Sequence, residues 1–172
     1  MIDLLRKRRS IRRYQDRPID AATREVLQEA LLRSPSSRNI RPWEFVWIED
    51  KETLARLARA KPHGSSFLAG AALGIVVCGD PGQSDVWIED CAIAAVIAHL
   101  TAASLDLGSC WVQIRNRHHD EETTAEAYVR RLLGLPDTWQ VEAIIAVGWP
   151  AEEKRGILWT DLPREKIRPF PS

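Results

Sequence analysis

The stretch from residue 6 to residue 13 concentrates the chemically useful side chains of this sequence. Six of its eight residues are basic (RKRRSIRR), although the whole chain balances 24 Lys and Arg against 24 Asp and Glu. Like charges on neighbouring residues repel, and a bound anion would relieve that repulsion. A phosphate can accept bidentate hydrogen bonds from several guanidinium groups, and the hydroxyl of Ser10 can donate to a remaining oxygen. The same charges also fit a solvated basic face or a weak nucleic-acid patch.

Two more polar clusters lie far from this stretch along the chain. Residues 34–41 (SPSSRNIR) are rich in helix and strand breakers, so they form a loop, and they carry hydroxyl and amide groups. Lys166 and Arg168 form a second cationic cluster near the C-terminus. Two cationic clusters and one hydroxyl- and amide-rich loop suit a ligand with a phosphate at one end and a polar heterocycle at the other.

The sequence lacks the motifs of several other chemistries. No G-x-G-x-x-G follows a predicted strand, no Walker-type phosphate loop is present, and no H-E-x-x-H or C-x-x-C pair offers a metal site. We interpret His118 and His119 as surface residues and His99 as a hydrogen-bonded core residue. We therefore predict no metal site.

Length and composition are those of an ordinary globular protein. The 172 residues suffice for one domain, 1–172, with 45% hydrophobic and 28% charged residues. A net charge of zero and a pI near 6.9 argue against a dedicated nucleic-acid binder. Three cysteines in apolar runs predict buried, reduced thiols, and the charged N-terminus does not resemble a signal peptide. Both features favour a cytoplasmic protein.

The clusters must be positioned by a mixture of helices and strands. Apolar periodicity and capping residues predict helices over 2–8, 20–34, a short segment after Asp50, 86–107, and 120 to the cap at Gly134. Runs of bulky and β-branched residues predict strands over 43–49, 72–79, 109–114 and 141–147. This order lacks regular βαβ spacing. It predicts an α+β fold, with a mixed sheet of four or five strands flanked by helices.

The segment 86–107 is the longest predicted helix and is apolar nearly all round, which is typical of a helix buried in the middle of a fold. Carboxylates at Glu89, Asp90 and Asp106 leave only 91–105 uninterrupted, short of the ~20 residues that a bilayer needs. We expect no membrane span. The polar, proline-punctuated residues 150–172 predict an extension over the surface or over a partner subunit.

Four segments in this order resemble the flavin-dependent nitroreductase family. They are residues 8–14 (RRSIRRY) with Pro18-Ile19, residues 35–46 (PSSRNIRPWEFV), Glu89-Asp90 with residues 107–112 (LGSCWV), and residues 147–150 (VGWP). The resemblance covers nearly the whole chain. It implies the α+β nitroreductase fold, a homodimer formed through the long helices, and FMN at the dimer interface.

The resemblance also assigns roles by position. It implies that the FMN phosphate and its ribityl or pyrimidine edges contact Arg8, Arg9, Ser10 and Arg12, and that Lys166 and Arg168 complete the phosphate end. The isoalloxazine ring would meet Pro35, Ser36, Ser37 and Asn39 from the partner subunit, and would lie along Trp111, Val112 and Gln113. No residue forms a covalent intermediate; flavin N5 is the reactive centre, and Arg12 is the candidate that stabilises the reduced flavin.

The implied activity is that of an FMN-dependent NAD(P)H oxidoreductase. NADH or NADPH passes hydride to the flavin and leaves, and a nitroaromatic, a quinone or a similar electron-poor small molecule then takes two electrons. Arg41 and Trp43 would lie at the substrate pocket. The chain departs from the family at Arg41, where the motif usually has Gln, and at Gln113-Ile114, where larger members carry Glu-Gly.

Two other functions fit the same residues. One is a flavoprotein of the same fold with a specialised dehydrogenation or flavin-binding role. The other is a non-enzymatic module that binds anions or nucleic acid through the basic stretch, which predicts strongly salt-dependent binding and no cofactor. The neutral net charge disfavours this module.

Overall fold

The protein forms a four-stranded sheet with helices on both faces. A computed structural model describes residues 1–170. The strands are β1 (Trp43–Ile48), β2 (Leu73–Gly79), β3 (Gly108–Gln113) and β4 (Gln140–Gly148), in the order β1-β2-β4-β3. β2 is continuous, apolar and central, as its sequence predicts.

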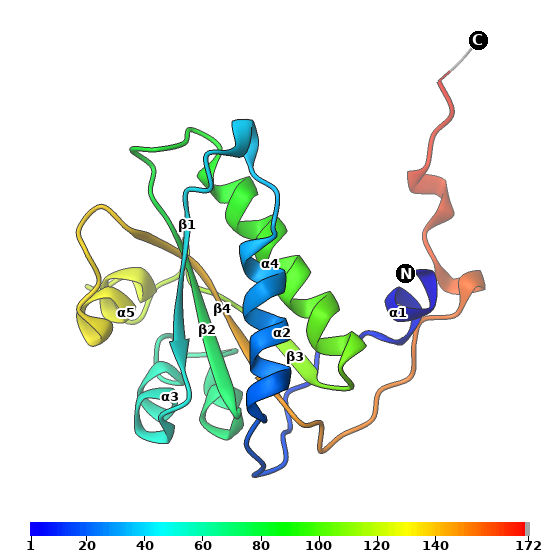
Figure 1. The fold of residues 1–172 in the computed structure, drawn as a ribbon, viewed down its shortest axis with the longest axis horizontal. Helices are drawn as coiled ribbons and strands as arrows, with labels where there is room; N and C mark the ends of the chain where they lie inside the picture. Colours follow the sequence, from blue (N-terminus) through cyan, green and yellow to red (C-terminus); the bar gives the residue numbers. More distant parts are fainter. Residues whose placement is uncertain (171–172) are drawn as a thin grey trace.

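The described residues form five α-helices (Figure 1). They are α1 (Ile2–Lys7), α2 (Ala21–Leu32), α3 (Lys51–Leu57), α4 (Trp87–Ser104) and α5 (Ala125–Leu133), with short 3₁₀ turns at Ser37–Asn39, Ser66–Gly70, Trp159–Asp161 and Arg164–Lys166. α2 and α4 lie on one face of the sheet, and α3 and α5 lie on the other.

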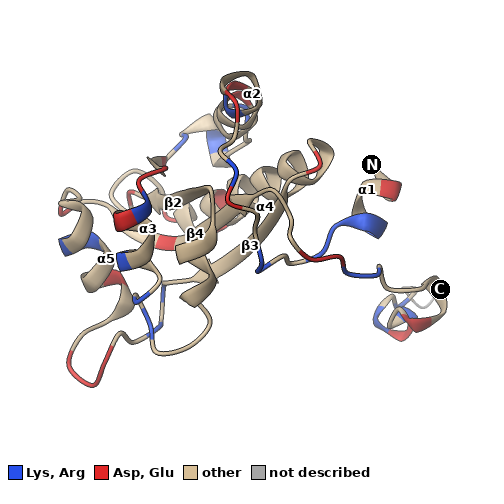
Figure 2. Ribbon diagram, turned by 90° about the horizontal axis from the view of Figure 1, so that it is seen from below, with Lys and Arg blue, Asp and Glu red and all other residues tan. Residues whose placement is uncertain are grey.

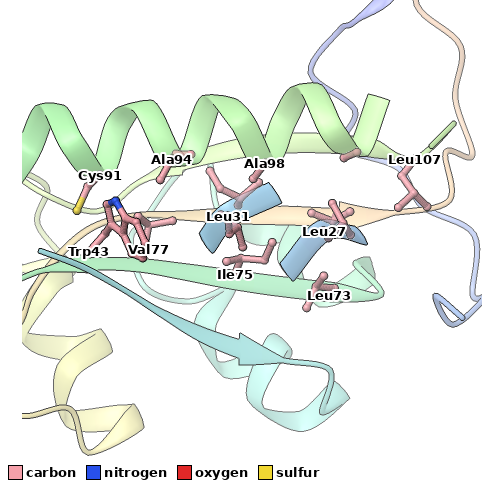
Figure 3. Packing of buried hydrophobic residues seen from close by; sticks show 14 of the residues in the cluster. Leu27, Leu31, Trp43, Leu73, Ile75, Val77, Cys91, Ala94, Ala98 and Leu107 are labelled. Atoms are coloured by element: carbon pink, nitrogen blue, oxygen red, sulfur yellow. The ribbon is translucent and has the colours of Figure 1, made fainter. Parts of the chain in front are cut away.

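Each face of the sheet has its own apolar core. In Figure 3, Leu27 and Leu31 of α2 and Ala94 of α4 meet Ile75 and Val77 of β2. A second core fills the opposite face, and its residues include Leu54, Leu57, Val76, Val112, Val129, Ile144 and Ala146. Successive strand residues point to opposite faces, so a sheet with continuous apolar strands must be covered twice.

The long helix is buried on one side and exposed on the other. Its small residues Ala94, Ala95 and Ala98 are fully buried, which lets the helix approach the sheet closely. The side chains of Ile93 and Val96 are 42% and 50% exposed. By length and composition α4 could cross a membrane, yet a helix that packs along a sheet passes the same test. The helix is thus central, as predicted, and within the described residues one of its apolar faces stays exposed.

The sheet also corrects the expected pairing. All three strand pairings are antiparallel, whereas a mixed sheet was expected. Parallel pairing is confined to one bridge between Ser10 and Ser109 in the part of the chain that the structure describes. The N-terminal segment runs beside β3 there and then diverges, so it does not become a full fifth strand.

The helix expected to begin at Asp120 begins at Ala125. Thr124 caps it, because its Oγ1 accepts a hydrogen bond from the Ala127 N–H at 3.0 Å. Asp120 instead closes a turn in the preceding loop by accepting from the N–H groups of Glu122 and Thr123. Asp120 and Thr124 are both residue types that cap helices, so the sequence could not distinguish them as the start of α5. The hydrogen bonds in the first turn show that Thr124 is the cap.

The C-terminal segment leaves the body of the molecule. From Ile157 onward it extends away from the sheet and lies beyond α1 (Figures 1 and 2). It exposes the large apolar side chains of Ile157, Leu158, Trp159, Leu162, Ile167 and Phe170. The expected extension 150–172 therefore does not cover the sheet of its own chain, and its last two residues lie outside the described part.

Candidate functional site

The basic stretch is held against the edge of β3. The Ile11 N–H donates to the Ser109 carbonyl at 3.0 Å. A Cβ atom on Gly108 would lie 2.7 Å from Ile11 Cγ2, so only glycine allows this approach. Ile11 is thereby buried between the charged residues on either side. This explains why an apolar residue interrupts the basic run.

A hollow of about 520 Å³ opens beside this segment, within the usual size range of small-molecule sites. Its lining comes from α1 and the basic stretch, from the end of α4 and the start of β3, and from residues 150–156. Six cationic residues belong to the lining; they are Arg6, Lys7, Arg8, Arg9, Lys154 and Arg155. Figure 2 shows the basic stretch and the 152–155 segment running beside one another.

Glu152 and Lys154 fix the backbone of the basic stretch. The Arg12 and Arg13 N–H groups donate to Glu152 Oε1 at 2.6 and 3.3 Å, and Lys154 Nζ donates to the Ser10 carbonyl at 2.8 Å. The hydrogen bond from the Arg12 backbone is the main cause that lowers the pKa of Glu152 below its ordinary value. This carboxylate therefore stays ionised and neutralises part of the local charge.

Sequence reasoning missed Glu152, Lys154 and Arg155. They lie about 140 residues from their partners, and the sequence carries no signal for that contact. The Lys-Arg pair at 154–155 was the available hint, but it sits in what reads as a polar tail.

The predicted cations differ in where their guanidinium groups lie. Arg8 and Arg9 line the hollow, and Arg9 also donates to the Arg155 carbonyl. Arg12 does not line it; its guanidinium lies 5.7 Å from the centre of the Phe67 ring. Ser10 is half-buried beside the hollow. Lys166 and Arg168 lie on the exposed C-terminal segment and do not reach the hollow of their own chain.

Two residues of β3 present side chains toward α4. Trp111 donates through Nε1 to Gln113 Oε1 at 2.9 Å, and Gln113 donates in turn to the Arg115 carbonyl at 3.0 Å. The Trp111 ring stacks on His99 with centroids 6.3 Å apart. Val112 faces the opposite core and is fully buried, so only its backbone can reach a ligand on the α4 side.

His99 is a buried histidine that holds Ser109, the residue next to the basic stretch. Its Nδ1 lies 2.7 Å from Ser109 Oγ, as expected of a hydrogen-bonded core histidine. Burial is the main cause that lowers the pKa of His99 to about 4, and the nearby charge of Arg8 acts in the same direction. The imidazole is therefore neutral at pH 7.

The loop at 34–42 is anchored to the first turns of α4. The Ser37 N–H donates to Oδ1 of the buried Asp90 at 2.8 Å, and Arg38 pairs with Asp85 at 3.0 Å. Arg38, Asn39 and Arg41 have φ angles of 51°, 55° and 59°, a left-handed conformation that costs energy for residues other than glycine. Such strain persists where the surroundings enforce it, and it is common at binding sites.

Hydrogen bonds inside the loop hold Arg41. Its N–H donates to Ser36 Oγ at 2.8 Å, and its Nε donates to Asn39 Oδ1 at 3.0 Å. Pro35 is exposed at the start of the loop. Trp43, expected at the substrate pocket, is 7% exposed and stacks on Phe45, and it lines a separate hollow of about 280 Å³ between α2 and β1.

The polar loop and the basic stretch lie at opposite ends of α4. The loop contacts Asp90 in the first turn, whereas the hollow reaches Ala103 near the last turn and Leu107 beyond it. Asp90 and Ala103 are 13 positions apart on this helix, which corresponds to about 20 Å along its axis. The two clusters are therefore well separated on one chain. The predicted site residues are thus gathered into two half-sites.

Known sequences give a consistent set of relatives. The sequence profile described as the nitroreductase family matches residues 5–62 and 59–149. A protein of Archaeoglobus fulgidus, provisionally named NADH dehydrogenase/NAD(P)H nitroreductase, is 35% identical over 157 residues, which are 89% of this chain and 87% of the relative. An NADH dehydrogenase of Thermus thermophilus is 28% identical and is aligned over 94% of this chain and 91% of its own.

Solved structures share the architecture. An FMN-dependent nitroreductase from Clostridium difficile R20291 is 41% identical and superposes with a TM-score of 0.97 over 100% of both chains. A protein from Parabacteroides distasonis, provisionally named NADH dehydrogenase/NAD(P)H nitroreductase, is 30% identical with a TM-score of 0.88 over 99% of this chain and 98% of its own. These likenesses confirm the predicted α+β fold with its long central helix.

Proposed function

Because this chain belongs to the nitroreductase family, we propose that it is an FMN-dependent NAD(P)H oxidoreductase. It reduces nitroaromatics, quinones or similar electron-poor small molecules by two electrons. The name of the C. difficile structure supports FMN, and the names of the sequence relatives support a nicotinamide donor. The activity resides in the cofactor, and the protein binds, orients and shields it.

The hollow beside β3 has the chemistry that an FMN phosphate needs. Arg8, Arg9 and Lys154 offer charge-assisted donors, and Gly108 keeps the backbone close. The ring end would lie along the Trp111 indole, whose orientation Gln113 fixes. FMN, when bound, supplies the two-electron chemistry. Arg12 supplies a cation at the exposed edge of the basic stretch and is our candidate for stabilising negative charge there.

The separation of the two half-sites is the observation that carries this proposal. An apolar stripe on α4, which includes Ile93 and Val96, lies exposed between them. If two chains pack these stripes together antiparallel about a two-fold axis, the loop of one chain lies near the basic stretch of the other. The active unit is therefore a homodimer with two sites, each built from both subunits.

The exposed C-terminal segment fits the same assembly. Its apolar residues Leu158, Trp159 and Phe170 are 67%, 67% and 94% exposed within the described residues. Burying them against a second copy would stabilise the dimer by the hydrophobic effect. Lys166 and Arg168 lie on this segment, so we propose that they reach a phosphate site once the segment is packed in the dimer. Three buried free thiols fit a reducing compartment, which supports a cytoplasmic location.

The test begins with the purified protein. We expect a yellow protein that releases about one FMN per chain on denaturation and that has the mass of two 19.5 kDa chains by light scattering. NADH or NADPH should bleach the flavin anaerobically, and a nitroaromatic or quinone should restore the colour. A colourless protein that does not take up FMN would contradict the cofactor assignment. A monomer that binds FMN normally would contradict the shared site.

A further inference from the structure

We propose that Arg41 selects reactants that carry an oxyanion, either a carboxylate on the acceptor or the 2′-phosphate of NADPH. This inference rests on the proposed function and on the shared dimeric site. It assigns a specificity role to a residue of the polar loop whose guanidinium points away from the core and which no catalytic step requires.

The structure holds Arg41 ready for a ligand. Its backbone N–H is fixed by Ser36 Oγ and its Nε by Asn39 Oδ1. The backbone has a φ of 59° directly before Pro42, a conformation that an arginine does not adopt without enforcement. The Ser36 hydroxyl and the Asn39 amide, two of the polar side chains of the loop, thus orient Arg41.

The guanidinium of Arg41 forms no ion pair within the described residues. Arg38, three positions earlier, pairs with Asp85 at 3.0 Å, but no carboxylate of residues 1–170 lies within ion-pair distance of Arg41. In that part of the chain only Nε of its guanidinium is hydrogen-bonded, so both terminal nitrogens remain able to donate. A planar guanidinium with two such nitrogens matches a carboxylate or phosphate in bidentate fashion.

The position of Arg41 connects it with the reacting molecules. It lies in the same loop as Ser36 and Ser37, which in the proposed dimer face the cofactor bound by the partner, and its side chain is exposed. The nicotinamide donor and the acceptor enter the same space in turn. A fixed cation at the rim of that space favours whichever of them carries an oxyanion, and it disfavours none of the neutral acceptors.

The experiment compares matched reactants in matched variants. Arg41→Gln removes the unpaired charge. Arg38→Gln is the control, because it removes a charge of the same loop that already forms an ion pair with Asp85. Each variant is assayed with 4-nitrobenzoate and with neutral 4-nitrobenzamide at a fixed donor, and then with NADPH and with NADH at a fixed neutral acceptor. Flavin content and thermal midpoint are recorded for every variant.

We expect Arg41→Gln to raise KM about tenfold for one oxyanion-bearing reactant, as for the loss of one charge-assisted hydrogen-bonded pair. A rise for 4-nitrobenzoate identifies the acceptor as the source, and a rise for NADPH identifies the donor. KM for the neutral acceptor and KM for NADH should be unaffected. Arg38→Gln should leave two KM ratios unchanged, that of 4-nitrobenzoate to 4-nitrobenzamide and that of NADPH to NADH. Arg41→Lys should recover part of the loss, because the charge returns without the planar fork.

Contrary results separate the two proposals. If Arg41→Gln binds FMN and turns over with both ratios unchanged, or if Arg38→Gln shifts them equally, the role of Arg41 is overturned while the oxidoreductase stands. If the unmodified protein neither binds FMN nor oxidises NAD(P)H, the proposed function fails and this inference fails with it.

Discussion

At the scale of single residues, the cations around the hollow differ in what already engages them. Arg9 is bonded to the Arg155 carbonyl, and Lys154 is shared between Glu152 and the Ser10 carbonyl. Arg8 lines the hollow and forms no ion pair with any described residue. Among the described residues, Lys7 and Arg155 also line the hollow without an ion pair. A cation without a protein partner gains most from a bound phosphate, so Arg8, which lies in the basic stretch itself, is our candidate for the phosphate contact.

Arg8→Ala should therefore weaken FMN binding by roughly 1.5–3 kcal/mol, the range for a hydrogen bond to a charged group. Arg12→Ala should also weaken it, but less, because that guanidinium lies against Phe67 outside the hollow. Flavin titration followed by fluorescence quenching measures both affinities. Arg33→Ala, which removes an exposed cation paired with Glu29, is the control. Undiminished affinity in both site variants would remove the basic stretch from the cofactor site.

His99 makes stability depend on pH. The pKa of its imidazole is about 4 in the folded protein against 6.5 ordinarily, so between pH 6.5 and pH 4 the unfolded chain takes up a proton that the folded chain refuses. The contribution of His99 to the free energy of unfolding is therefore fully present above pH 6.5 and is lost as pH falls toward 4. A pKa shift of this size corresponds to about 3 kcal/mol.

The variant His99→Gln isolates this effect from that of the carboxylates. The free-energy difference between the wild type and the variant should shrink by about 3 kcal/mol when urea unfolding is repeated at pH 7 and at pH 4. The carboxylates titrate alike in both proteins and cancel in this comparison. A difference that does not change with pH would show that the imidazole is not kept neutral by burial.

At the scale of elements, local capping signals placed two helix starts and one helix end correctly, and misplaced one helix start. Asp20 and Asp50 cap α2 and α3 as predicted, and each accepts from the N–H three residues on. The start of α5 was misplaced, because Asp120 and Thr124 are both capping types. Its end at Gly134 was predicted correctly, since φ there is 62° and glycine tolerates this conformation.

Substitution at Gly134 tests that C-terminal cap. Gly134→Ala should lower the free energy of unfolding by about 1 kcal/mol, because a left-handed conformation is strained for alanine. Gly70→Ala is the matched control: neither site has an atom within 4 Å of the added methyl, but Gly70 is not left-handed. It should be neutral or slightly stabilising in urea unfolding. Equal losses at both sites would argue that the φ angle is not the cause.

At the scale of the whole molecule, the single chain is incomplete in three respects. Its ligand-binding groups are divided between the ends of α4, an apolar stripe on that helix is exposed, and its C-terminal segment leaves the body with large apolar side chains uncovered. An antiparallel pair of chains would bring the divided ligand-binding groups together, and it would bury both the apolar stripe and the apolar side chains of the C-terminal segment. Hydrophobic burial and ligand binding would then depend on the same interface.

Val96→Glu places a charge in the middle of the exposed stripe and should convert the dimer to a monomer, because burying an unpaired carboxylate is costly. FMN retention should fall with it, since half of each site is lost. Light scattering and flavin content measure the two effects. Arg131→Glu on α5, across the sheet from the stripe, is a larger change of charge and should leave both unchanged. A Val96→Glu dimer would exclude this face of α4 as the interface.

The sequence by itself determined most of the elements and pointed to the clusters from which the candidate site is built. β-branched runs marked all four strands, and capping residues marked three helix termini, because strand propensity and capping act within a few residues. The basic stretch and the polar loop stood out for the same reason, since clusters of charge or of hydroxyl groups are visible in the order of residues. The mixed sheet was wrong because pairing direction depends on how the connections fold back.

Tertiary structure alone decided which clusters meet. It brought Glu152 and Lys154 to Ser10 and Arg12, it directed Val112 into the opposite core, and it placed the loop and the basic stretch at opposite ends of α4. It also showed that Ser36 and Asn39 hold Arg41. Such contacts join residues whose approach is set by the packing of helices on the sheet. No local pattern encodes that packing. The family resemblance implied that the loop acts from a partner subunit, but only the folded chain showed how far the loop and the basic stretch lie from each other.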